Sequence, residues 1–175
     1  VSASVLINGT PYTVVDELPS RSVGFDQDRS VCTVRVREYP DCVPGDPAQV
    51  LITINGETTT YMTGVVAAIP LSDEPAYDVH ITDTLYRLQQ RTTAPMTWRN
   101  TAWTTALRGM LHAAGYTDSD IASLDDPGSV YVLGPVYPIT IPTDTLIADV
   151  INDLLQFAGA SLWGNADGRL IIRTD

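Results

Sequence analysis

The residues of this sequence that are best suited to chemistry are two histidines, two cysteines and three pairs of adjacent carboxylates. Histidine binds zinc or acts as a general base when further ligands or a carboxylate lie at a suitable spacing. His80 lies in an alternating apolar and polar run, and His112 follows Leu111 in a helical pattern. Neither has a cysteine or carboxylate at the usual metal-binding spacing. We therefore interpret both histidines as structural or surface residues.

The carboxylate pairs do not predict a hydrolytic site. Acid–base cleavage of a glycosidic bond requires two carboxylates that face each other across that bond. The pairs here are neighbours in predicted turns and helix caps: Asp16 with Glu17, Asp73 with Glu74, and Asp125 with Asp126. The sequence also lacks a Gly-x-Ser-x-Gly elbow, a Walker loop and a Gly-x-Gly-x-x-Gly motif. A Ser-His-Asp triad needs no fixed order in sequence, but two unremarkable histidines disfavour it. We expect no catalytic residue, no metal, no cofactor and no enzymatic activity.

The two cysteines are predicted to be thiols. Cys32 alternates with polar residues and shares a face with Val34 and Val36, which predicts a buried position. Cys42 follows a predicted chain reversal that would place it near Arg37 instead. The separation of the two cysteines would then be on the order of 15 Å, whereas a disulfide needs Cα atoms within about 7 Å.

The aromatic residues allow two interpretations. Trp98, Trp103 and Trp163, with Tyr131 and Tyr137, could line a sugar-binding surface, but aromatics also fill cores and protein interfaces. Trp103 and Trp163 lie in apolar patterns and are predicted to be core residues. Trp98 precedes Arg99 and Asn100 in a predicted loop, so we expect it to lie at an interface.

The charge balance argues against nucleic-acid binding. The 175 residues include 10 basic and 21 acidic side chains, a net charge of −11, and no basic cluster is present. Nucleic-acid binding takes most of its affinity from basic groups that neutralise phosphates. No apolar run reaches the roughly 18 residues of a membrane span. The first residues show no basic region followed by an apolar core, so no signal peptide is expected.

The sequence pattern changes once, near residue 82. Residues 1–82 read as about six short strands with Gly and Pro punctuation, which predicts a β-barrel-like domain. Asn8-Gly9 and Asn55-Gly56 are the preferred pairs for two-residue hairpins. Within the long strand predicted over residues 58–69, Gly64 indicates a bulge or a sharp bend.

Residues 83–175 are predicted to form a second, helix-rich α/β domain, which makes the fold class α+β. Helical periodicity predicts helices near 83–90, 101–114 and 144–158, and a short further helix over 118–124. Gly115 and Gly159 are predicted to follow helix ends. The chain then closes with a β-hairpin over 160–173.

Three motifs follow one another along the chain in a characteristic order. Thr63-Gly64-Val65-Val66 leads through a loop to residues 77–85, and a helix ends on Met110-Leu111-His112-Ala113-Ala114-Gly115. The last is the closing helix, followed by Gly159, a strand and Asp167-Gly168-Arg169-Leu170. This order resembles the phage tail hub family, the baseplate hubs of tailed phages that are related to the hub part of type VI secretion spikes. Known hubs usually continue into a further barrel segment, whereas this sequence stops at Asp175.

The resemblance implies a structural virion protein at the tail tip. Family hubs form a ring, often a trimer, and connect the tail tube and distal tail proteins to a spike or fibre. The apolar terminal strand would be an exposed sheet edge in a monomer, so Leu170 and Ile172 join Trp98 as expected interface residues. The alternatives are a carbohydrate- or receptor-binding module of a phage tail, and a small cell-wall hydrolase.

Overall fold

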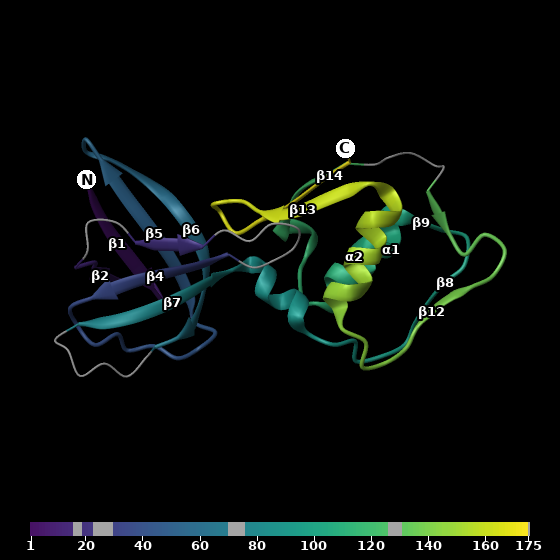
Figure 1. Ribbon diagram of the computed structural model, residues 1–175, viewed down its shortest axis with the longest axis horizontal. Coiled ribbons are helices and arrows are strands. Elements are labelled where there is room, and N and C mark those ends of the chain that lie inside the picture. The colour runs from purple at the N-terminus through teal and green to yellow at the C-terminus, as the bar shows by residue number, and fades with distance from the viewer. Residues whose placement is uncertain (16–18, 23–29, 70–75, 126–130, 175) are drawn as a thin grey trace. The chain divides into compact units, whose positions relative to one another are not determined.

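The computed structural model describes most of the chain and divides it into two compact units (Figure 1). The described residues are 1–15, 19–22, 30–69, 76–125 and 131–174. The first unit contains Val1–Thr84 and Gly164–Gly168, and the second contains Leu85–Trp163 and Arg169–Asp175. No helix in the described part of the chain is long and apolar enough to cross a membrane.

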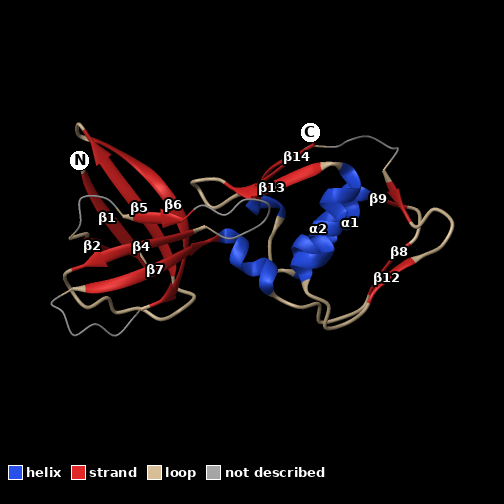
Figure 2. Ribbon diagram, viewed as in Figure 1, coloured by secondary structure: helices blue, strands red, loops and turns tan. Residues whose placement is uncertain are grey.

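The first unit is built on one antiparallel sheet with the strand order β2-β1-β5-β6-β7-β4-β3. Its strands are β1 Ser2–Ile7, β2 Thr10–Thr13, β3 Ser20–Ser22, β4 Val31–Val36, β5 Pro47–Ile54, β6 Glu57–Ala68 and β7 Tyr77–Asp83. The sheet curls into a half-barrel (Figure 2). Val14, just after β2, forms an isolated bridge with Val36 of β4. The Val15 N–H also donates to the Arg35 carbonyl at 2.7 Å. The barrel-like character predicted for this half of the chain is confirmed.

Local turn chemistry sets two hairpins of this sheet. Asn8 and Gly9 connect β1 to β2, and Asn55 and Gly56 connect β5 to β6. All four residues have positive φ, between 51° and 86°. Two consecutive positive φ values define the type I′ turn, which Asn-Gly adopts readily and whose twist matches that of the strands. Both predicted hairpins are confirmed.

The core of the first unit follows the alternation of its strands. Cys32, Val34 and Val36 of β4 are fully buried, as predicted for one face of a strand. Cys42 is half-buried, and neither cysteine is in a disulfide. The predicted thiol state is confirmed.

Gly64 occupies the point of closest approach between two strands. It pairs with Ala48 of β5 and with Asp83 of β7. A Cβ atom at this position would lie 1.9 Å from the carbonyl oxygen of Thr82. Register shifts lie on either side of it, opposite Val50 and Leu51 of β5 and near Val66. Bulges therefore flank Gly64, and the glycine itself is required by the close backbone contact.

The second half of the chain contains more strand than its sequence predicts. Its helices are a 3₁₀-helix at Thr84–Gln89, α1 Trp103–Ala113, a 3₁₀-turn at Asp118–Asp120 and α2 Ile147–Ala158. Its strands are β8 Met96–Trp98, β9 Thr101–Ala102, β10 Ile121–Leu124, β11 Val132–Leu133, β12 Ile139–Ile141, β13 Ala160–Gly164 and β14 Leu170–Thr174. The expectation of a helix-rich half is not supported. Most of these strands are short and pair with distant segments, so local periodicity does not reveal them.

The two α-helices supply much of the core of the second unit. They lie side by side, and their apolar faces are buried against each other and the sheet of β10, β14 and β13 (Figure 1). The Trp103 indole N–H donates to the Leu154 carbonyl of α2. Gly159 has a φ of 59° in the left-handed region and ends α2. Gly115, with a φ of 84°, follows α1 in the same way. The predicted apolar stripes and helix ends are confirmed.

Candidate interaction surfaces

The three residues predicted to form an interface are core residues of the second unit. Trp98 is 6% exposed, and Leu170 and Ile172 are 0% exposed. The apolar terminal strand β14 is not an edge, because it lies between β10 and β13. The parallel strand β10 pairs with the edge of β14 that was expected to be exposed. The expected exposure of these three residues is therefore corrected: their side chains stabilise the fold of the isolated chain.

The histidines make ordinary polar contacts. His80 Nδ1 lies 2.9 Å from the Thr33 hydroxyl of the neighbouring strand. His112 Nε2 lies 3.4 Å from an Asp118 carboxylate oxygen at the surface. Among the described residues, no group of three His, Cys, Asp or Glu side chains is placed to hold a metal ion. Of the carboxylate pairs, only Asp125 is described, so the geometry of the pairs lies outside the described residues.

Cys42, the partly exposed cysteine, has a thiol with a raised pKa. Burial raises the pKa of the Cys42 thiol, and the nearby charges of Asp46 and Asp41 raise it further. The thiolate is the reactive form of cysteine, and a raised pKa lowers its population. Cys42 packs against the core of the first unit.

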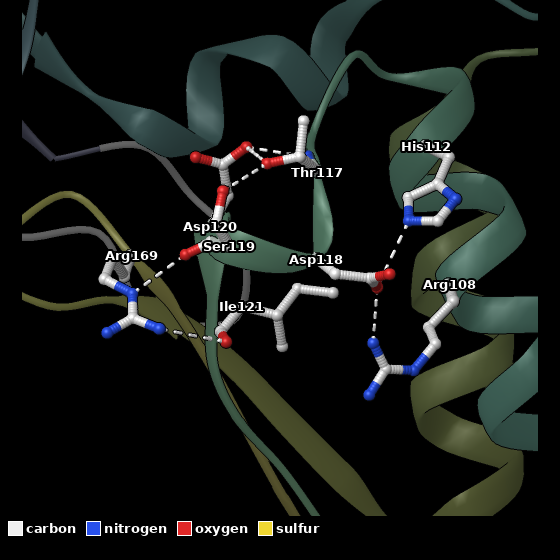
Figure 3. A network of polar contacts seen from close by, with 8 residues as sticks. All are labelled: Arg108, His112, Thr117, Asp118, Ser119, Asp120, Ile121 and Arg169. Carbon is white, nitrogen blue, oxygen red and sulfur yellow. Dashed lines mark hydrogen bonds and ion pairs between the residues drawn. The ribbon is translucent and has the colours of Figure 1, made fainter.

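A polar network surrounds the turn between α1 and β10 (Figure 3). The Asp120 carboxylate accepts from the Thr117 N–H at 2.7 Å and from the Thr117 hydroxyl at 2.9 Å. The hydrogen bond from the Thr117 N–H has the largest effect and lowers the pKa of Asp120. The Thr117 hydroxyl and the positive charges of Arg87 and Arg169 lower this pKa further, whereas burial opposes the shift. These contacts form a capping box at the start of the 3₁₀-turn.

The same network ties the turn to its neighbours. Arg108 of α1 donates to Asp118 at 2.6 Å, and Arg169 donates to the carbonyl of Ser119 at 3.0 Å (Figure 3). These contacts join the side chains of the turn to its own backbone, to α1 and to Arg169. We interpret the network as structural, because it positions β10 for pairing with β14.

A two-stranded ribbon in the second unit presents a different kind of surface. β8 pairs antiparallel with β12, and β9 pairs antiparallel with β11. On one side only Arg99 and Asn100 separate the two pairs, whereas residues 134–138 separate them on the other side. The longer side must bulge outward. We call residues 134–138 the ribbon loop.

Gly134 fixes the start of the ribbon loop. Its φ is 62°, and a Cβ atom there would lie 2.5 Å from the Trp98 carbonyl oxygen. Its own carbonyl accepts from the Asn100 N–H at 3.0 Å. Pro135 and Pro138 restrict φ at two further positions of the loop. The loop therefore has a defined shape.

The ribbon loop exposes apolar side chains. Val136 is 74% exposed and Tyr137 is 81% exposed, and Ile139 of the adjoining β12 is also exposed. Residues 132–143 include no charged side chain, in a chain of net charge −11. Prolines at 135, 138 and 142 favour an extended chain here, but they do not show that the side chains are exposed. Their exposure depends on the β8–β12 pairing, which local sequence does not reveal.

The other aromatic residues considered in the sequence analysis differ in exposure. Trp98 and Trp103 are buried, and the Trp103 prediction is confirmed. Trp163 is 40% exposed, so its predicted core position is wrong. Tyr131 makes an edge contact with Phe157 of α2 at 5.7 Å between ring centres.

Comparison with known proteins finds similarity in structure only. No family model matches the chain, and no curated protein sequence matches it. A 43 kDa tail protein of prophage MuSo2 from Shewanella oneidensis superposes with a TM-score of 0.66 at 15% identity, over 98% of this chain and 54% of that one. A tail protein from Neisseria meningitidis gives 0.65 at 14% identity, over 98% of this chain and 50% of that one.

Another similar structure comes from a secretion system. An Escherichia coli component of the type VI secretion system, itself similar to bacteriophage T4 tail proteins gp27 and gp5, gives a TM-score of 0.61 at 11% identity, over 98% of this chain and 49% of that one. The chain has the fold of phage tail proteins. The resemblance predicted from its motifs is thereby confirmed at the level of fold. The chain spans about half the length of the structures that it matches.

Proposed function

We propose that this chain is a structural protein of a bacteriophage tail. The observation that carries the proposal is the match of 98% of the chain to solved phage tail proteins, with TM-scores of 0.66 and 0.65. Nearly every part of the chain contributes to this shared fold. The similar structures are tail proteins, so we infer that this chain works by binding other tail subunits.

Its proposed position is the tail tip. There it forms a ring-like hub, a trimer, that connects the tail tube to distal tail, spike or fibre proteins. The motif order of the sequence and the similarity to a type VI secretion component support this position. The net charge of −11 suits a protein near the path of DNA, because a negative surface repels phosphates.

Labelling of the native particle tests the proposal. The chain would carry a short epitope tag in the phage that encodes it, and gold-conjugated antibody would be located by negative-stain microscopy. We expect gold at the tail end farthest from the capsid, and we expect particles without functional tails when the gene is deleted. Label on the capsid, or no label on intact particles together with normal tails after deletion, would contradict the proposal.

A further inference from the structure

We infer that the ribbon loop and the adjoining strand β12 form the contact surface for a second copy of this chain. The inference rests on the proposed function as a ring subunit and specifies which surface makes the contact. Val136 and Tyr137 are the most exposed of the large apolar side chains described in the second unit. Exposed apolar side chains next to one another on a soluble protein commonly mark an interaction site. Tyrosine is also enriched among the residues that dominate interface energies.

The backbone beside the loop offers a second element of the contact. Among the described strands, β12 pairs only with β8, so its other edge is open. An open edge presents unpaired N–H and C=O groups that another chain can satisfy. Ile139 lies on this strand and is a further exposed apolar side chain.

The loop is also shaped in advance. Pro135 and Pro138 restrict its backbone, and Gly134 is held against the Trp98 carbonyl. Binding costs less conformational entropy when a loop already has its bound shape. A rigid loop that exposes apolar side chains is therefore well suited to bind another protein surface.

The low charge of the ribbon favours a second copy of the chain as the partner. Charged residues make up 18% of the chain, yet the ribbon over 96–102 and 132–141 contains only Arg99. Two copies of net charge −11 repel each other over most of their surfaces, and an uncharged surface allows them to approach. A basic partner would instead be recognised by carboxylates, and the ribbon has none. A glycan partner would require several aromatics on one face, but Trp98 of the same ribbon is buried.

Salt dependence and a matched pair of variants test the inference. We would measure self-association by sedimentation velocity up to roughly 100 µM, where a micromolar contact is saturated. Val136→Ser with Tyr137→Ser removes the apolar surface without changing the charge. Tyr39→Ser with Val43→Ser is the control, because these residues have the same types and are 65% and 63% exposed in the first unit.

We expect the wild-type chain to self-associate, and more strongly at about 0.5 M salt than at 0.05 M, because salt screens the repulsion between acidic copies. We expect the ribbon variant to weaken the association by about tenfold or more, and the control variant to change it less than about twofold. A photo-crosslinker at position 137 should join two copies of the chain. Near-ultraviolet circular dichroism would verify that each variant is folded.

Several results would overturn the inference. These are a wild-type chain that stays monomeric at both salt concentrations, equal weakening by both variants, and association that salt weakens, which is the signature of a basic partner surface. This failure can be told apart from failure of the proposed function. A monomeric chain still labels the tail tip if the function is correct, and a self-associating chain that is absent from tails leaves the ribbon contact intact.

Discussion

At the scale of single residues, Gly64 shows how backbone spacing dictates a side chain. A Cβ atom at Gly64 would lie 1.9 Å from the Thr82 carbonyl oxygen, which neither strand can avoid without moving. We predict that Gly64→Ala lowers the free energy of unfolding by about 3 kcal/mol or prevents folding. Urea denaturation measures this. Gly109→Ala in α1 is the control, because its Cβ would meet only the flexible end of Met96 at 3.2 Å. It should be neutral or stabilise the chain by up to about 1 kcal/mol, and an equal loss in both variants would contradict the account.

Asp120 gives a residue-scale prediction for pH. The pKa of this carboxyl is lowered from its ordinary value of 3.8 in the folded chain. Its charged form therefore contributes stability that is present above pH 3.8 and is lost as the pH falls through the folded pKa. We predict that Asp120→Asn lowers the free energy of unfolding by less than about 1 kcal/mol near pH 7, because the group is partly exposed. The difference from wild type should shrink below pH 4 or so. A difference that grows on acidification would contradict this assignment.

At the scale of elements, the structure assigns opposite environments to two strands that the sequence does not distinguish. β14 lies between β10 and β13, whereas β12 pairs with β8 alone among the strands that the structure describes. We predict that the amides of β14 exchange with deuterium far more slowly than those of β12 at low protein concentration. Protection of β12 should rise when the chain self-associates, if the ribbon is the contact. Hydrogen exchange with mass spectrometry measures both, and rapid exchange of β14 would contradict the strand order.

The same elements show what sequence could and could not predict. The Asn-Gly hairpins, the β4 alternation and the apolar stripes of α1 and α2 depend on residues close in sequence, and they are confirmed. Residues Ile121–Leu124 were predicted as part of a helix but form strand β10. Local sequence could not show this, because β10 pairs with β14, which is far away in the chain. The buried state of Leu170 and Ile172 depends on that same pairing. The ribbon loop was missed for the corresponding reason, since its exposure follows from the match of β8 to β12.

At the scale of the whole molecule, the proposed function depends on the surfaces of the chain. Its acidic charge, its tail-protein fold and the exposed ribbon loop of the second unit agree with the proposed assembly with copies of itself and with other tail proteins. Enzymatic alternatives predict a measurable activity. We expect no clearing in a zymogram of bacterial cell walls and no specific binding on a glycan array.

The most direct test of the central claim is a cryo-electron microscopy reconstruction of the tail tip of the phage that encodes this chain. The account predicts a ring of three copies at the tip, between the tail tube and the distal tail or fibre proteins. A reconstructed tail with no density for the chain, or with the chain located only in the capsid, would contradict it.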